Sequence, residues 1–275
     1  MKGPELTAYA HSYSGLIVAF PYHADEPLRP LSATVLRFES PLLYDYYQKS
    51  REVLEGQTQY SDRIRGPEPG EFYGLARTGP YSFANIYVAF RDNTRWCAAV
   101  IKDIEMPWGE RRRFLFQNHA VSICEKGDDG VFIDEDEAYF VCGILNAPIV
   151  SKFISASSDE RSFKIRPPVF VPRYDARIAS HRQIAATSKK AHADRKFRQA
   201  AGEEIERAYL GLCTAGCQAT GGRRQERGEG KAVKDRVEES AGFERFQGLA
   251  AKLIQVQRSE IGKKWSKKGE GQQKE

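Results

Sequence analysis

The sequence predicts an α+β fold, in which a small mixed or antiparallel sheet has flanking helices and a basic helical C-terminal tail follows. Apolar residues recur near helical spacing over residues 41–55 and again after residue 134. From residue 72 to residue 133 the spacing changes to two, which is typical of strands. Residues 176–275 contain 22 Lys+Arg and 13 Asp+Glu, which predicts the basic tail.

Size and composition narrow the class of protein. The 275 residues are 41% hydrophobic and 29% charged, which is typical of a globular protein with a real core. No apolar run approaches the roughly 18 to 20 residues that cross a bilayer, and the start lacks a secretory signal. We therefore expect a cytoplasmic protein without a membrane partner. The five cysteines fit buried thiols better than a disulfide framework.

The N-terminal part predicts a strand and a helix. Residues 15–22 are a short apolar run ended by Pro21, which predicts a buried strand followed by a loop. Ser40 and Pro41 then suit the N-cap and first position of a helix over residues 41–55. Four Gly and Pro residues make residues 62–71 a loop.

The middle part predicts the sheet. Ile86, Val88 and Phe90 alternate with other side chains, residues 97–101 are an apolar run, and residues 121–124 alternate again. Turn-forming residues lie between these segments, at 91–94, 107–109 and 127–130.

The C-terminal part predicts helices. Asp134 suits an N-cap, and the acidic residues 135–137 would lie at the positive end of the helix dipole. Further helices are predicted over residues 149–154, 179–200, 203–214 and 241–262, with a flexible linker at 221–230. We divide the chain into a linker and helix (1–59), a recognition domain (60–200) and a helical basic tail (201–275).

Common catalytic motifs are missing from the sequence. It contains no glycine pattern of a dinucleotide or P-loop site, and no nucleophile elbow. Cys213 and Cys217 lack a second ligand pair, and His181 and His192 would be roughly 16 Å apart on one helix. The acidic residues 128–137 are explained by turn and capping chemistry. We therefore predict no catalytic residue and no metal site in this chain.

A binding surface is the remaining candidate. Arginines and tyrosines interleave around the loop leading into the sheet, and further arginines lie at its turns: Arg63, Arg65, Tyr73, Arg77, Tyr81, Tyr87, Arg91, Arg95, Arg111, Arg112 and Arg113. Arginine clamps phosphates and reads guanine, so this mixture suits a DNA groove. The alternatives are half-buried tyrosines with arginines at the rim of a sheet, and a solvated basic tail.

Four segments in order resemble the target-recognition region of TaqI-like adenine-specific DNA methyltransferases, including fused restriction–modification enzymes. They are Leu43–Tyr47 with Leu54 and Tyr60-Ser61; Glu71–Arg77 with Tyr81–Phe83; Glu137–Phe140 with Ile144–Pro148; and Ile165–Pro168 with Val171–Asp175, His181, Ala185, Ser188 and His192. The family's upstream catalytic domain, with its S-adenosylmethionine glycine motif and its [NDS]PP[YF] motif, has no counterpart here.

The resemblance implies a sequence-specific DNA-recognition module whose catalytic domain is absent from this chain. The expected partners are double-stranded DNA and a separate methyltransferase catalytic subunit, where S-adenosylmethionine would bind. Whether this chain is itself an enzyme stays open. The phosphate-contact candidates are Lys189, Lys190, Arg195, Lys196 and Arg198, and the base-edge candidates are Arg63, Arg65, Tyr73, Arg77 and Arg95.

Two other classes stay open at this point. One is a Mg²⁺-dependent nuclease or DNA-processing enzyme that uses the acidic residues around Asp134. The other is a protein-interaction module that packs the amphipathic segment 241–262 against a partner helix.

Overall fold

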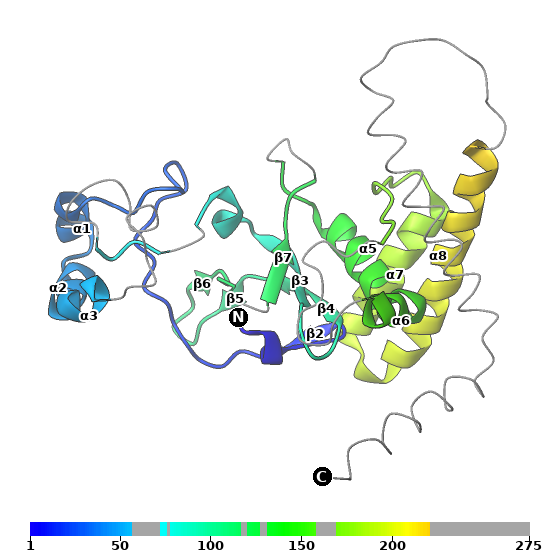
Figure 1. The fold of residues 1–275 in the computed structure, drawn as a ribbon, viewed down its shortest axis with the longest axis horizontal. Coiled ribbons are helices and arrows are strands. Elements are labelled where there is room, and N and C mark those ends of the chain that lie inside the picture. Colours follow the sequence, from blue (N-terminus) through cyan, green and yellow to red (C-terminus); the bar gives the residue numbers. More distant parts are fainter. Residues whose placement is uncertain (57–71, 76–77, 117–119, 127–130, 158–168, 221–275) are drawn as a thin grey trace, which may run out of the picture. The chain divides into compact units, whose positions relative to one another are not determined.

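The computed structural model describes residues 1–56, 72–75, 78–116, 120–126, 131–157 and 169–220. They belong to two compact units. Unit 1 contains residues 1–91 and 97–142, and unit 2 contains residues 92–96 together with the described residues from Gly143 onward. The α+β prediction is confirmed (Figure 1). The linker 221–230 and the predicted helix 241–262 lie outside the described residues.

Unit 1 begins with a small hairpin. A short 3-10 helix (Gly3–Glu5) leads into β1 (Leu6–Thr7), which pairs antiparallel with β2 (Ala10–His11). The backbone N–H of Tyr9 donates to the Ala98 carbonyl at 2.9 Å, which fixes this hairpin to the main sheet.

The predicted strand over residues 15–22 is wrong. Leu16, Ile17 and Val18 are 54–70% exposed, and this segment forms no ladder with any described strand. A strand requires a neighbour for its backbone N–H and C=O groups, and an apolar run cannot supply that neighbour by itself.

Three short helices follow in place of the predicted loop and single helix. They are α1 (Ala33–Glu39), α2 (Pro41–Lys49) and α3 (Arg51–Glu55). Pro41 takes the first helical position as predicted, but Ser40 makes no side-chain cap. The capping serine is Ser32, whose Oγ accepts from the Val35 N–H at 3.4 Å.

The main sheet has three antiparallel strands in the order β4–β3–β7. They are β3 (Ile86–Arg91), β4 (Cys97–Lys102) and β7 (Ala120–Ile123). In the register, Val88 lies opposite Val100 on one side and Ile123 on the other. Side chains on both faces of β3 and β4 are buried, including those of Tyr87 and Phe90. The predicted small sheet is therefore confirmed as antiparallel.

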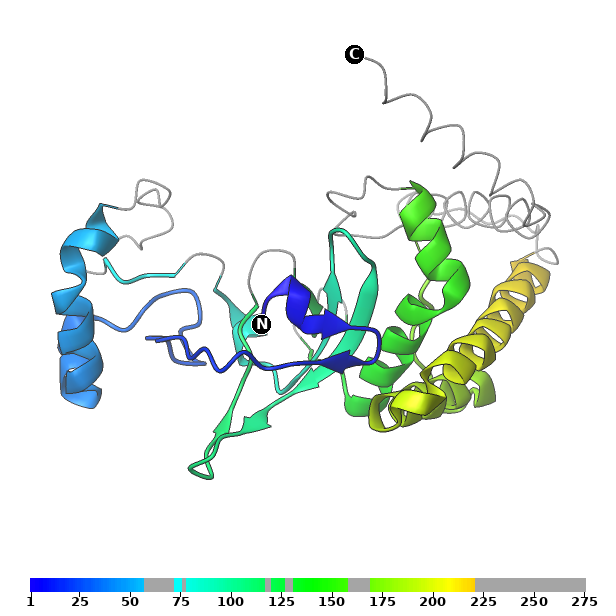
Figure 2. The ribbon, with the colours of Figure 1, turned by 90° about the horizontal axis from the view of Figure 1, so that it is seen from below.

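A second hairpin interrupts the chain between β4 and β7. Its strands are β5 (Ile104–Glu105) and β6 (Arg111–Arg112), and Figure 2 shows it extending beyond the end of the three-stranded sheet. The predicted turn at 107–109 connects the two strands.

Helix α5 (Glu135–Asn146) begins where the sequence predicts. Asp134 accepts the Glu137 N–H at 2.9 Å through its carboxylate, which is the predicted N-cap. In unit 1, Glu135 pairs with Lys102 of β4 at 2.8 Å, and the Lys102 ammonium lies 5.4 Å from the centre of the Tyr139 ring. These contacts attach the first turns of α5 to the sheet.

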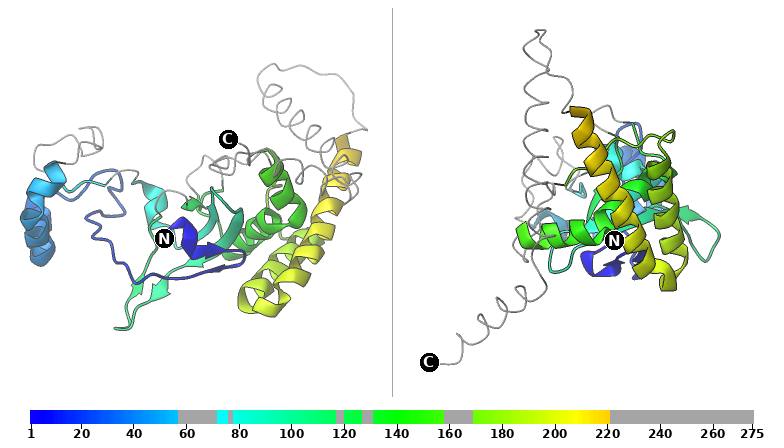
Figure 3. Two further views of the ribbon diagram at one scale, coloured as in Figure 1. Left: turned by 60° about the horizontal axis from the view of Figure 1, so that its bottom comes forward. Right: turned by 90° about the vertical axis from the view of Figure 1, so that its right-hand side faces the viewer.

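Unit 2 is helical. The end of α5 is followed by α6 (Pro148–Ser157), α7 (Ala179–Ala193), a 3-10 turn (Arg195–Phe197) and α8 (Arg198–Thr220). Helices α7 and α8 lie side by side (Figure 3). No described helix is by itself long and apolar enough to span a membrane. Helices α5 and α6 meet that test only as a pair bent by 60°.

Candidate nucleic-acid interface

The predicted phosphate contacts lie where α7 passes into α8. We name residues 189–198 the basic corner: they contain five Lys or Arg residues and one acidic residue, Asp194. Lys189, Lys190, Arg195 and Lys196 are exposed, and Arg198 is half-buried. The structure therefore brings all five predicted phosphate contacts to one short bend.

Asp194 causes this bend. It has an extended backbone (φ −120°, ψ 109°), its carboxylate accepts the Lys196 N–H at 2.8 Å, and its own N–H closes α7 on the Lys190 carbonyl. The prediction of a continuous helix over 179–200 is correct to Ala193 and wrong at this residue. An aspartate that caps backbone N–H groups competes with helix continuation, so the helix stops and restarts.

Several side chains of the basic corner are held in place. The Lys190 ammonium lies 4.0 Å from the centre of the Phe197 ring, across the bend. The Arg198 Nε donates to the Ala191 carbonyl at 3.1 Å, and His192 Nδ1 donates to the Ser188 carbonyl at 2.8 Å. The Arg198 contact shows that this residue stabilises the bend in addition to adding charge.

Part of the positive charge of the basic corner has no ion-pair partner within the described part of the chain. Among the described residues, no ion pair involves Lys190, Arg195 or Lys196. Cations at the C-terminus of α7 are also favoured by the helix dipole, which accounts for Lys189 and Lys190 without any ligand. Arg195 and Lys196 lie beyond the end of α7, so the dipole of that helix does not explain their positive charges.

Arg95 is exposed in the turn between β3 and β4. The next residue, Trp96, is buried, and its Nε1 donates to the Leu145 carbonyl at 2.7 Å within unit 2. Thr94 takes a positive φ of 57°, which tightens the turn. This anchored turn presents Arg95 to solvent.

Tyr73 does not fit its predicted role as a base-edge contact. It is 2% exposed, its hydroxyl donates to the Leu31 carbonyl at 2.7 Å, and its ring stacks on Tyr47 with centroids 4.9 Å apart. Together with Leu36 and Phe72 it forms the small core behind α1 and α2. The aromatic residues that suggested a binding surface therefore pack in a core at this position.

Other members of the predicted aromatic–arginine surface divide into buried and exposed groups. Tyr87 is buried, its hydroxyl donates to the Tyr81 carbonyl at 2.8 Å, and burial raises its pKa. Arg113 donates to the Phe83 carbonyl, while Arg111 and Arg112 are exposed on β6. Arg63, Arg65 and Arg77 lie outside the described residues.

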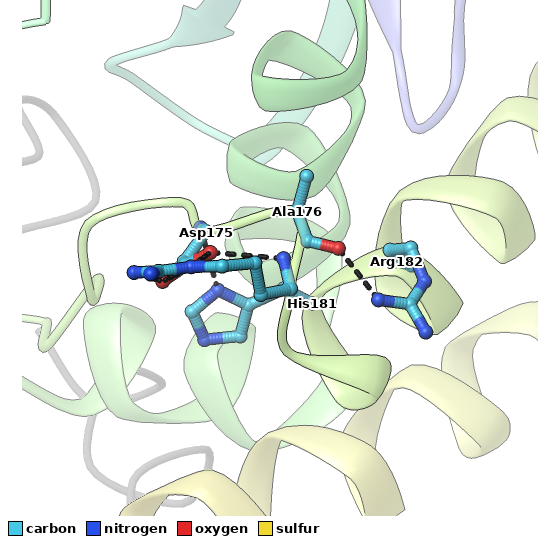
Figure 4. Close-up of polar contacts among 5 residues, drawn as sticks. Asp175, Ala176, His181 and Arg182 are labelled. Carbon is cyan, nitrogen blue, oxygen red and sulfur yellow. Dashed lines mark hydrogen bonds and ion pairs between the residues drawn. The ribbon is translucent and has the colours of Figure 1, made fainter.

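A polar cluster precedes α7 in unit 2. The Asp175 N–H donates to Nδ1 of the buried His181 at 3.0 Å, and Arg182 donates to the Ala176 carbonyl (Figure 4). Arg177 forms an ion pair with the Asp175 carboxylate at 2.7 Å, and its hydrogen bonds hold the pKa of that carboxyl at about 2. Burial lowers the pKa of His181, although Asp175 opposes this effect.

This cluster ties the preceding loop to the first turn of α7. Ile178, at the N-cap position, has no side chain that can cap, and His181 binds the preceding loop instead. Because Nδ1 accepts a backbone N–H, His181 is neutral there. This hydrogen bond holds the loop that leads into α7. Because Nδ1 is used in it, Nδ1 cannot also bind a metal ion.

The acidic residues behind the nuclease alternative are used locally. Asp134 and Glu137 both pair with Lys126 at 3.0 Å. Burial would raise the pKa of Asp134, but the Glu137 N–H and Lys126 outweigh it and lower that pKa. Among the described residues no three His, Cys, Asp or Glu side chains are grouped to hold a metal ion. Asp128 and Asp129 lie outside those residues.

No protein-family model matches this chain, and a search of the curated proteins finds no match either.

Proposed function

We propose that this chain is a sequence-specific DNA-recognition module that binds the duplex backbone through its basic corner. The observation that carries the proposal is the exposed group of Lys189, Lys190, Arg195 and Lys196 around one capped bend. Lysine and arginine release condensed counterions when they neutralise phosphates, and this release drives most of the affinity of DNA-binding proteins.

In this proposal the two groups of predicted contacts have different tasks. Phosphate contacts from the basic corner position the module without reading sequence. Arg95, with Arg63, Arg65 and Arg77, would read base edges, because the arginine fork matches the acceptors of guanine in the major groove.

The reaction would be carried out elsewhere. By the resemblance described above, the partner is an adenine-specific DNA methyltransferase domain on another polypeptide, working in the cytoplasm. S-adenosylmethionine would bind to that domain, and this chain would choose the target site. A neighbouring reading frame with a glycine-rich donor motif and an [NDS]PP[YF] tetrapeptide would support this part of the proposal.

The salt dependence of binding tests the proposal. We would measure the affinity for labelled random duplexes by fluorescence anisotropy between 50 and 200 mM salt. Four phosphate contacts predict a loss of roughly 10²-fold over this range. A variant with Lys189, Lys190, Arg195 and Lys196 all changed to Gln should bind weakly, and its log–log salt slope should be smaller by roughly four.

Two results would contradict the proposal. One is a parent protein that ignores duplexes even at 50 mM salt. The other is a quadruple variant that keeps the affinity and the salt slope of the parent. Cleavage of plasmid DNA that requires Mg²⁺ would instead select the nuclease alternative.

A protein-interaction module is a second candidate, and one observation favours it. Helices α1–α3 expose large apolar side chains: Phe38 at 87%, Leu42 at 84%, Val53 at 69% and Tyr46 at 59%. Exposed apolar groups of this kind mark protein-binding surfaces. A defined complex that survives nuclease and moderate salt, and that Leu42→Ser disrupts, would select this function.

A further inference from the structure

The β5–β6 hairpin carries an exposed tryptophan at its tip. Trp108 is 59% exposed, whereas Trp96 is 6% exposed. Tryptophan is a large contributor to cores because of the apolar area it buries, so an exposed one on a protruding hairpin has no folding role of that kind. Figures 2 and 3 show the hairpin extending away from the three-stranded sheet.

The turn that presents Trp108 is well defined. The Gly109 N–H donates to the Met106 carbonyl at 2.8 Å, and the Met106 N–H donates to the Glu110 carbonyl at 2.8 Å. Pro107 fixes φ at the first central position, and Gly109 takes the left-handed conformation with φ +84°. This is a three-residue hairpin loop with a bulge at Gly109, which places Trp108 at its outermost central position.

Side-chain contacts also orient the indole. Trp108 Nε1 donates to the Glu110 carboxylate at 3.1 Å, and Arg112 donates to the same oxygen at 2.6 Å. The hydrogen bond from Trp108, followed by the charge of Arg112, holds the pKa of Glu110 below its usual range. A side chain oriented before binding loses less rotamer entropy when it contacts a ligand.

The charges of this hairpin largely cancel. Arg112 is paired with Glu110, and Arg111 lies opposite Glu105 in the strand register. Phosphate attraction is therefore not what this hairpin adds. Its available contact is the flat face of an indole on a narrow two-stranded ribbon, which is an element that can enter a DNA groove.

We propose that the β5–β6 hairpin is a DNA-probing arm, and that Trp108 stacks against a base or wedges between base pairs of the bound duplex. This inference rests on the proposed function, and it assigns a second contact, in unit 1, to the same partner. Apolar side chains inserted between base steps are a known way to bind and kink DNA, and an uncharged side chain neutralises no phosphate, so it adds nothing to the salt slope. The sequence predicted only a turn here.

The test uses the full chain with Trp108→Ala and Trp108→Phe, and Leu28→Ala as a control that removes another exposed apolar side chain. Trp108→Ala should weaken binding by about 5- to 150-fold at fixed salt, with the salt slope unchanged. Trp108→Phe should keep much of the affinity, and Leu28→Ala all of it. In a Trp265→Phe background, where Trp96 and Trp108 remain, duplex DNA should quench the emission, and adding Trp108→Ala should abolish that quenching.

The outcomes separate this inference from the proposed function. If the parent binds DNA and Trp108→Ala binds equally well, the arm has no role in binding, while the basic corner keeps its role. If Trp108→Ala changes only a complex with a protein, the arm serves that protein and the inference is wrong. If the parent fails to bind any duplex at 50 mM salt, both proposals fall together.

Discussion

His181 shows how one side chain can hold the segment that leads into a candidate interface. It is buried, accepts the Asp175 N–H through Nδ1, and lies in a stacked arrangement with Tyr174 at 6.1 Å. Protonation would put a hydrogen on the nitrogen that accepts this bond. The neutral form is therefore part of the folded structure.

This arrangement predicts how stability changes with pH. Because burial lowers the folded-state pKa of His181, the unfolded chain binds its proton more readily. The contribution of His181 is then complete above the unfolded pKa of about 6.5 and is lost as the pH falls toward the folded-state value. Urea denaturation between pH 7.5 and pH 5 should show decreasing stability across this window.

A non-titrating variant isolates the effect of His181. His181→Asn keeps an acceptor for the Asp175 N–H, so it should flatten the loss of stability between pH 7.5 and pH 5. His11 also has a pKa lowered by burial, and its contribution should persist in the variant. Equal pH profiles for parent and variant would show that His181 does not contribute. The Asp175 carboxyl, with its pKa of about 2, titrates in a separate, more acidic range.

At the scale of elements, the helices of unit 2 pack closely at Gly143. A Cβ built on this residue would lie 2.9 Å from Ile184 Cγ2, 3.2 Å from Ser188 Cβ and 3.4 Å from Ile205 Cδ1. The end of α5 therefore approaches α7 and α8 at a position where only a hydrogen fits.

Gly143→Ala should destabilise the protein by about 1–3 kcal/mol, because a buried and well-packed core must shift to accept the methyl group. Gly211→Ala is the matched control, since no heavy atom lies within 4 Å of its added Cβ. At that exposed position on α8, the alanine should raise the free energy of unfolding by up to about 1 kcal/mol through its higher helix propensity. Chemical denaturation would measure both changes. A neutral Gly143→Ala would contradict the close packing.

Local sequence signals predicted many of these elements. Pro41 and Asp134 set the starts of α2 and α5, period-two alternation located β3, and an apolar run located β4. The break at Asp194 also has a local cause, because an aspartate can cap the next turn, but the helical periodicity on both sides hid it. The strand predicted at 15–22 failed because strand pairing is a non-local property.

At the scale of the whole molecule, the distribution of charge matters more than its total. The formal net charge is +5, yet residues 1–175 carry 20 Lys+Arg against 24 Asp+Glu, and the rest of the chain carries 22 against 13. Salt screens charges beyond about 8–10 Å at physiological ionic strength, so only cations near the phosphates add much to binding.

This distribution predicts that, between two variants of equal net charge, the positions of the removed lysines decide the affinity for duplex DNA. Lys189→Gln with Lys190→Gln should weaken duplex binding and reduce the salt slope by about two. Lys49→Gln with Lys152→Gln removes the same charge from exposed positions on α2 and α6, and this variant should bind like the parent. Anisotropy titrations at two salt concentrations would compare them. Equal losses in both double variants would indicate non-specific attraction to net charge.

The sequence by itself determined the α+β class, the start of α5, the presence of a small sheet and the concentration of cations in residues 189–198, because these depend on local periodicity, capping and composition. Tertiary structure decided which side chains are accessible. It buried Tyr73 against Tyr47 and exposed Trp108 on a hairpin. Burial depends on which distant segments pack together, and neighbouring residues do not contain that information.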